Sequence, residues 1–165
     1  MDPLRRLSEV LGDEEKAKRI YEFAENSCKF SSHGWEHVVR VFELADRIGR
    51  KERADMEVLL VAAILHDVGR MISEEKHALA SARLSEDLLR DLGFSEEKIE
   101  RIIHCILAHS YSSGVTPETL EAKILSDADK LDALGAIGVA RVFMYSGEKG
   151  RSIPDSIKHF KEKIL

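Results

Sequence analysis

The chain has 165 residues, the length of one ordinary domain, and this argues against two independent hydrophobic cores. Its formal net charge of −5 excludes a mainly electrostatic DNA binder, which needs a net basic face. Aromatic residues are only 6% of the sequence and charged residues are 33%, a composition that favours helices over strands. We therefore expect an all-α protein. Its 7 histidines are an unusual feature for an acidic chain with few aromatic residues.

Cysteine use and hydropathy indicate the compartment. Cys28 and Cys105 form neither a C-x-x-C pair nor a disulfide framework, so both are expected to be reduced thiols. The first residues, MDPLRRLSEV, contain no apolar stretch of signal-peptide length. The longest apolar run, Val58 to Leu65, is far shorter than the roughly 20 residues that span a bilayer. We expect a soluble, cytoplasmic protein with no membrane partner.

Capping and helix-ending residues divide the chain into helical segments. Asp13 and Ser73 are expected to cap helices, and Pro117 suits a first helical turn. The expected helices, caps included, cover residues 4–11, 13–27, 33–53, 55–68, 73–92, 95–110, 117–134, 136–145 and 155–163. A glycine-bearing basic loop is expected at 146–151. The pattern predicts an all-α bundle that forms one domain over residues 1–165.

His37 lies on the apolar seam of the expected helix 33–53 and therefore points toward the core. Its seam partners, at spacings of +4, +3 and +4, are Val41, Leu44 and Ile48. His33, one turn earlier, and Arg40, three residues later, share the side of His37.

The expected helix 55–68 is apolar all round, which marks a central buried helix. It ends in His66-Asp67, and a buried imidazole beside a buried carboxylate is unfavourable unless something neutralises the pair. A divalent cation would do so, because imidazole and carboxylate are both good ligands. The alternative is a hydrogen-bonded histidine followed by an aspartate at the end of the helix.

The neighbouring helices repeat this pattern. His77 and His109 each lie on an apolar seam and are expected to point inward. His104 lies off the seam that carries His109 and is expected to face outward or sideways, and His159 is expected at the surface. Helices from different parts of the chain therefore bring inward-facing histidines together.

An acidic cluster lies near the end of the expected helix 117–134. This helix has two apolar seams, so an aspartate is buried whichever seam faces the core. Periodicity cannot choose between Asp127 and Asp129. The ligands so found are far apart in sequence, which indicates a site assembled by folding and not a local metal finger.

These residues, taken in order, resemble a known family. The order His37, then His66-Asp67, then Asp129 resembles the H…HD…D signature of the HD-domain metal-dependent phosphohydrolases. The strings HGWEHVVRV, AAILHDVGR, ILAHS and LSDADKLDALGAIGVAR are similar to the small single-domain, YedJ-like branch. The resemblance covers about residues 20–150 and implies an all-α bundle around the metal. It also chooses Asp129, because the last ligand of the family is the aspartate of an Ala-Asp pair.

The resemblance implies hydrolysis of a phosphoester or phosphoanhydride in a nucleotide or a similar small phosphorylated substrate. In the small branch, release of pyrophosphate from nucleoside triphosphates is one known activity. One or two divalent ions per chain are implied, with Mn, Fe, Ni, Zn and Mg as candidates. The implied metal ligands are His37, His66, Asp67 and Asp129. The nucleotidase branch has a glutamate three residues after the HD pair, and here that position is Arg70, which argues against a nucleotide monophosphatase.

The expected mechanism uses a water activated by the metal. Asp67 is expected to orient this water or to bridge to a second ion. His77 and His109 are candidates for a second ion, for phosphate binding or for protonation of the leaving group, and we favour the phosphate or acid role. Asp132 and Asp127 are expected to support the site from behind the ligands.

Cationic side chains near the predicted site are the candidates for substrate binding. They are Arg40, Arg70, Lys130, His33 and Arg141. The alternative for each is an ordinary solvated or ion-paired side chain. The 146–151 segment lacks a Walker-type pattern, so at most it forms a lid.

Three other functions compete with a phosphohydrolase. A nucleotide-sensing or regulatory HD module would keep the metal site with little turnover. A bundle with a structural metal is disfavoured because no cysteine lies on a seam. A nucleic-acid substrate is disfavoured because no basic stripe with aromatic residues is visible. The expected partner is a small phosphorylated substrate, and the sequence leaves both a monomer and a homodimer open.

Overall fold

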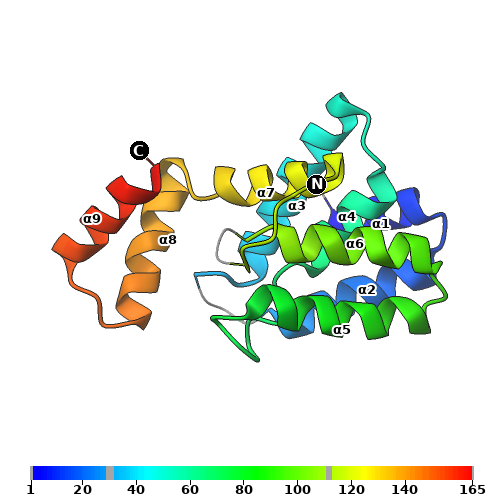
Figure 1. Cartoon of the computed structure of the whole chain (residues 1–165), viewed down its shortest axis with the longest axis horizontal. Helices are drawn as coiled ribbons and strands as arrows, with labels where there is room; N and C mark the ends of the chain where they lie inside the picture. Colours follow the sequence, from blue (N-terminus) through cyan, green and yellow to red (C-terminus); the bar gives the residue numbers. More distant parts are fainter. Residues whose placement is uncertain (1, 29–31, 111–112, 165) are drawn as a thin grey trace.

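The computed structural model of the protein describes residues 2–28, 32–110 and 113–164, with side chains described as far as residue 158. The architecture is all-helical, as the composition predicts (Figure 1). The helices are α1 (Pro3–Leu11), α2 (Glu14–Ser27), α3 (Trp35–Glu52), α4 (Met56–Leu65), α5 (His77–Asp91), α6 (Glu96–Ala108), α7 (Leu120–Leu131), α8 (Gly135–Glu148) and α9 (Ile153–Ile164).

Local signals in the sequence begin and end several helices where they are expected. The Asp13 carboxylate accepts the backbone N–H of Lys16 at 3.0 Å, and α2 follows. Ser95 Oγ likewise accepts the N–H of Lys98 at 3.4 Å at the start of α6. Gly12 ends α1 with a φ of 63°, a left-handed conformation that glycine adopts without strain. These boundaries depend on a few neighbouring residues and so can be predicted from the sequence.

The HD pair lies in a turn and not in a helix. Helix α4 ends at Leu65, three residues before the predicted end at Val68. The N–H of Val68 donates to the carbonyl of Leu65 at 3.3 Å, and the N–H of Arg70 donates to the carbonyl of Asp67 at 3.1 Å. The chain therefore tightens into three-residue turns directly after the buried helix.

Other boundaries also differ from the prediction. Helix α3 begins after Gly34, so His33 precedes it. Helix α5 begins at His77, because the Ser73 hydroxyl caps only a turn before it. Pro117 lies before α7, whose cap is Thr119, and α8 runs to Glu148 through half of the expected loop. At α7 a competing cap, Thr119, fixes the start of the helix, whereas α3 and α5 begin without a side-chain cap.

Gly69 allows the turn after α4 to pack directly on α5. A Cβ at this position would lie 2.2 Å from the backbone nitrogen of Ser81 and 2.5 Å from the carbonyl carbon of Ala80. The Ser81 hydroxyl accepts the N–H of Gly69 at 2.9 Å, which satisfies a buried donor. This contact brings His77, at the start of α5, beside Asp67.

Helix α4 forms the centre of the core, as its all-apolar sequence predicts. Its residues from Val58 to Leu65 are fully buried. Helices α1, α2, α3, α6 and α7 pack around it. The end of this rigid helix therefore holds His66 and Asp67 in the middle of the bundle.

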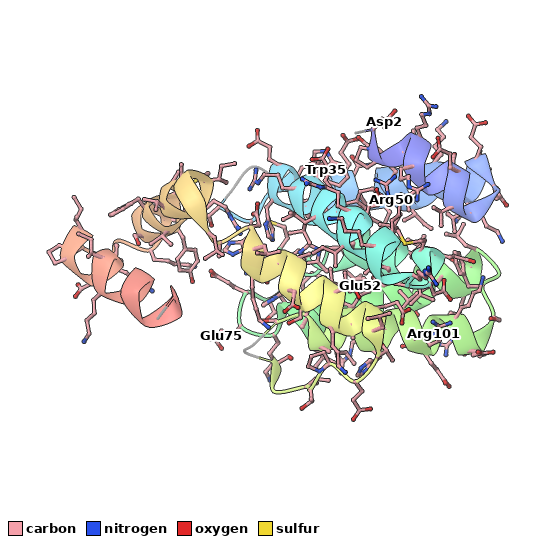
Figure 2. All side chains as sticks on the ribbon, turned by 90° about the horizontal axis from the view of Figure 1, so that it is seen from above. Asp2, Trp35, Arg50, Glu52, Glu75 and Arg101 are labelled. Carbon is pink, nitrogen blue, oxygen red and sulfur yellow. The ribbon has the colours of Figure 1, made fainter. Side chains whose placement is uncertain are left out.

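Helices α8 and α9 pack on each other and stand to one side of the bundle (Figures 1 and 2). The chain enters this hairpin from the end of α7. Exposed apolar residues gather between Leu131 and Ile157, including Leu134, Ile137 and Phe143. In the described ranges, no helix combines the length and the apolar character that a membrane span requires.

Candidate metal centre

Five parts of the fold meet at one cluster of histidines and aspartates. His37 comes from the first turn of α3, and His66 and Asp67 come from the turn after α4. The other members are His77 at the start of α5, His109 at the end of α6 and Asp129 in the last turn of α7. The four histidines and Asp67 are buried, and Asp129 is partly exposed.

Three of the four predicted metal ligands, His37, His66 and Asp129, satisfy the spacing of a metal-ligand group, and the fourth, Asp67, lies beside them. His37 Nε2 is 3.4 Å from His66 Nε2, 3.3 Å from Asp129 Oδ1 and 3.7 Å from Asp67 Oδ2. Two donors that each lie about 2.1 Å from one tetrahedral ion are about 3.4 Å apart. The spacing of these atoms therefore fits a single divalent ion.

A second group of donors lies on the other side of Asp67. His109 Nε2 is 3.6 Å from Asp67 Oδ1, and His77 Nε2 is 3.8 Å from the same oxygen. His66, Asp67 and His109 together satisfy the spacing of a metal-ligand triad. Asp67 thus presents Oδ2 to one group of ligands and Oδ1 to the other.

Hydrogen bonds fix the tautomer of all four histidines. The Nδ1 atoms of His66, His77 and His109 each lie 2.6–2.9 Å from the carbonyl three residues earlier, so Nδ1–H donates to that oxygen. His37 Nδ1–H donates to Asp132 Oδ2 at 2.7 Å. Hydrogen bonding at Nδ1 therefore leaves the Nε2 atom of each ring facing the cluster, the orientation that metal-ligating histidines have.

A buried histidine beside the predicted ligands also lacks a hydrogen-bond partner among the described residues. His77 Nε2 is buried and has no hydrogen-bond partner in the part of the chain that the structure describes. An unsatisfied buried acceptor is rare and calls for an explanation such as an ion. Imidazole nitrogens with carboxylate oxygens suit several first-row metals, so the residues fit a divalent ion without selecting one.

The charges of the cluster also favour a bound cation. Burial opposes ionisation of Asp67, but the adjacent His66 and Arg70 outweigh it and hold the pKa of Asp67 well below its usual value. At Asp129 burial is again outweighed, here mainly by His37, and the pKa is lowered. Burial lowers the pKa of His66 to about 4, so this imidazole is neutral near pH 7. These three groups therefore have the protonation states that metal binding requires. At His37 and His109 burial is outweighed by the neighbouring aspartates, which raise the pKa, so a bound cation would displace a proton there.

Arg70 lies on Asp67 in a bidentate contact. Its Nε is 2.9 Å from Oδ2, and its Nη2 is 3.2 Å from Oδ1. Two parallel charge-assisted hydrogen bonds of this kind hold the carboxylate plane. The residue at which the sequence departs from the nucleotidase pattern therefore borders the metal centre directly.

Asp132 supports His37 from outside the ligand group. Besides His37, its carboxylate accepts hydrogen bonds from Arg40 Nε at 2.6 Å and from Arg141 Nη1 at 2.5 Å. Burial opposes ionisation, but His37 and Arg40 outweigh it and lower the pKa of Asp132 to about 2. Arg40 and Arg141 thus reach the centre through Asp132.

The two aspartates that periodicity could not separate lie on different sides of α7. The Asp129 side chain is 30% exposed and faces His37, whereas the Asp127 side chain is 68% exposed. Lys130, three residues after Asp127, places its Nζ 3.8 Å from the Asp127 carboxylate at the surface. The expectation that Asp127 supports the site is therefore wrong, because the helix turns it toward solvent.

The remaining histidines fall into three situations. The His33 ring lies edge-on to His37, with centroids 5.4 Å apart, so it borders the centre although it is not helical. His104 Nε2 accepts the N–H of Glu118 at 3.1 Å between α6 and α7, away from the cluster, as expected. The side chain of His159 lies outside the described residues.

Sequence reasoning missed Ser32 and Glu148. The backbone N–H and the hydroxyl of Ser32 donate to the Glu148 carboxylate at 2.9 and 3.0 Å. The Ser32 carbonyl accepts Arg141 Nε at 2.7 Å. No local pattern signals a contact between residues so far apart in the chain.

This fold and this cluster define the chain as a member of the HD-domain family. The family model described as "HD domain" matches residues 34–134, which include His37, the HD pair and Asp129. The match covers more than half of the chain, so its membership is established.

Relatives of known structure support the same assignment. The chain is 36% identical over 143 residues to the protein YpgQ of Bacillus subtilis, covering 82% of this chain and 69% of YpgQ. The crystal structure of Bacillus subtilis YpgQ in complex with ADP has a TM-score of 0.74 and 32% identity, covering 91% of this chain and 77% of that one. An HD-superfamily hydrolase from Bacillus thuringiensis has a TM-score of 0.69 and 34% identity, covering 92% and 79%.

Proposed function

We propose that the protein is a metal-dependent phosphohydrolase that acts on a nucleotide or a similar small phosphorylated substrate. The observation that carries this proposal is the convergence of buried imidazole nitrogens and carboxylate oxygens in two overlapping groups with metal-ligand spacing. The similarity to an HD-superfamily hydrolase and to YpgQ, which was crystallised with ADP, supports the choice of substrate class. Membership of the small YedJ-like branch and release of pyrophosphate from nucleoside triphosphates are the finer parts of the proposal.

In this proposal His37, His66, Asp67 and Asp129 hold the divalent ion. The bound ion supplies an activated water and withdraws charge from the phosphoryl group. Asp67 is ionised because of its lowered pKa, so it can accept a hydrogen bond from the attacking water and orient it. The carbonyl and carboxylate partners of the imidazoles keep the ligands in place throughout the reaction.

His77 and His109 are proposed to serve the substrate. Both direct Nε2 at the space beside Asp67 Oδ1. His109, whose pKa is raised because Asp67 outweighs burial, is the better candidate to donate a proton to a phosphate oxygen or to the leaving group, whereas burial lowers the pKa of His77. The alternative role is a second ion, which the triad of His66, Asp67 and His109 would accommodate. The number of ions bound per chain separates the two roles.

Arg70 is the proposed first contact of the substrate phosphates, because it is the cation that borders the centre on Asp67. Arg40 contacts Asp132 and His33 contacts His37, so both lie behind the first group of side chains and stay candidates for substrate binding. Lys130 lies at the surface on Asp127 and stays a candidate only for a substrate that extends along α7.

A screen for released phosphate and pyrophosphate tests the proposal. Metal-free protein is incubated with Mn²⁺, Fe²⁺, Ni²⁺, Zn²⁺ or Mg²⁺ and a panel of nucleoside mono-, di- and triphosphates and cyclic nucleotides. We expect release that depends on one or two bound ions per chain. Asp129→Ala should abolish metal binding and release, whereas the matched variant Asp127→Ala, two residues away and exposed, should keep both.

Two results would count against the proposal. Wild-type protein that stays metal-free after addition of all five ions would remove its basis. Protein that binds metal and nucleotide tightly but releases neither product would favour the nucleotide-sensing or regulatory module over the enzyme.

A further inference from the structure

We propose that Arg141 is a positioning residue of the metal centre. Its guanidinium holds the Asp132 carboxylate against His37. Arg141 is itself held by the carbonyl of Ser32, and Ser32 is held by the Glu148 carboxylate. This inference rests on the proposed function, because it assigns Arg141 a role at the same centre without direct contact to the substrate.

Two arginines donate hydrogen bonds to the Asp132 carboxylate in addition to His37. His37 Nδ1 and Arg141 Nη1 both donate to Oδ2, at 2.7 and 2.5 Å. Arg40 contacts both oxygens, with Nε 2.6 Å from Oδ1 and Nη2 3.2 Å from Oδ2. Arg141 and His37 therefore share Oδ2, and we expect Arg141 to keep this oxygen directed at His37 Nδ1 against the bidentate contact of Arg40.

Arg141 also fixes the backbone that carries Asp132. Its Nη1 lies 3.3 Å from the main-chain carbonyl of Asp132, the residue that caps the C-terminal end of α7. Backbone and side chain of Asp132 are thus held by one guanidinium, and the side chain of Arg141 is only 13% exposed. Asp129 lies in the preceding turn of α7, so the position of a second predicted ligand depends on the same helix end.

One face of α8 holds Arg141 in this position. Arg141, Tyr145 and Glu148 follow one another at spacings of four and three residues, which places them on the same side of the helix. Ser32, 3% exposed, contacts both ends of this face, because its carbonyl accepts Arg141 Nε and its N–H and hydroxyl donate to Glu148. Between them, the Tyr145 ring lies edge-on to His33 with centroids 5.9 Å apart.

This polar face links a hairpin that otherwise lies apart to the interior of the bundle. Helices α8 and α9 pack mainly on each other (Figure 1). An exposed ion pair also joins Lys149, the residue after α8, to Glu74 in the segment between α4 and α5. Exposed pairs contribute little, so we expect the contacts of buried Ser32 with Arg141 and Glu148 to carry most of the link to the metal centre.

Binding of Mn²⁺ alone, measured by isothermal titration calorimetry, tests the role of Arg141 without any substrate. Support residues of this kind typically change metal affinity by about 10- to 100-fold, and we expect a loss in this range for Arg141→Ala. Glu148→Gln should lose affinity in the same direction but by less. Millimolar guanidinium, which can occupy the vacated site, should restore affinity to Arg141→Ala.

The matched controls are Arg47→Ala and Glu75→Gln, which remove an exposed arginine and an exposed glutamate (Glu75 is labelled in Figure 2). Both should bind Mn²⁺ as the wild type does. A second readout is the Nδ1–H resonance of His37 in metal-free protein, which should broaden or shift in Arg141→Ala and in neither control.

Unchanged Mn²⁺ affinity and an unchanged His37 resonance in Arg141→Ala, with a raised KM for the substrate, would overturn the inference and make Arg141 a substrate ligand. If Arg141→Ala does not fold, Arg141→Lys replaces it, since lysine keeps the charge but lacks the planar guanidinium whose Nε and Nη1 contact Ser32 and Asp132 separately. Wild-type affinity in a folded Arg141→Lys would then overturn the inference. Failure of the wild type to bind Mn²⁺ would instead be a failure of the proposed function.

Discussion

Replacing Gly69 with alanine should destabilise the protein, because the turn after α4 has no room for a methyl group. The added Cβ would lie 2.2 Å from the backbone nitrogen of Ser81 and 2.7 Å from the Cβ of Ala80. Relief requires the turn and α5 to separate, and overpacking of this kind costs about 1–3 kcal/mol. Separation also weakens the hydrogen bond from Gly69 N–H to Ser81 Oγ, which contributes about 1 kcal/mol. The free energy of unfolding should therefore fall by about 2–4 kcal/mol.

Urea denaturation followed by circular dichroism measures this change. Ser81→Ala isolates the hydrogen bond and should cost about 1 kcal/mol. Gly147→Ala is the matched control, because it lies in α8 with no atom within 4 Å of the added Cβ. Alanine should be neutral there or stabilise α8 by up to about 1 kcal/mol. A Gly69→Ala variant that unfolds at the same urea concentration as the wild type would refute the close packing of the turn on α5.

Three further changes test the core, a helix cap and the thiols. Leu60 is fully buried, so Leu60→Ala should lower the free energy of unfolding by about 2–5 kcal/mol in urea, and Leu79→Ala, at a 42% exposed position, by less than about 1 kcal/mol. Thr119→Ala should cost about 1 kcal/mol in the same assay, because Thr119 Oγ1 caps α7, and an unchanged midpoint would contradict the cap. Burial raises the pKa of Cys105 to about 12, so iodoacetamide should alkylate the folded protein far more slowly than the unfolded one. Above about pH 8.5 the unfolded thiol loses its proton, whereas the folded one keeps it up to about pH 12. The free energy of unfolding should therefore fall as pH rises through this range, and a flat profile would contradict the burial of Cys105.

The sequence predicts the parts of the site that depend on local periodicity. His37 repeats with the apolar residues of α3, and the all-apolar run of α4 places the HD pair at the end of the central helix. Asp127 and Asp129 show where periodicity fails, since they lie two residues apart on a helix with apolar residues on both sides. The packing direction of α7, which depends on α3, α4 and α6, decides that Asp129 faces His37.

Contacts between distant segments could not be predicted. Ser32 and Glu148 are 116 residues apart, and a serine before a helix looks like any other turn residue. The start of α5 was missed because Ser73 makes the hydrogen bond of a helix cap but serves only a turn. These cases show that one donor–acceptor pair does not determine the conformation of the residues that follow it.

The acceptors at Nδ1 divide the four imidazoles into two kinds, those oriented by a residue nearby in the sequence and one oriented by a distant residue. His66, His77 and His109 take their acceptor from the turn that immediately precedes them, so their orientation forms together with that turn. His37 takes its acceptor from Asp132, 95 residues away. Three imidazoles of the centre are thus preorganised by short-range structure, and the fourth acquires its orientation only when the end of α7 docks. The proposed metal site therefore reaches its full geometry only when the end of α7 is in place beside α3.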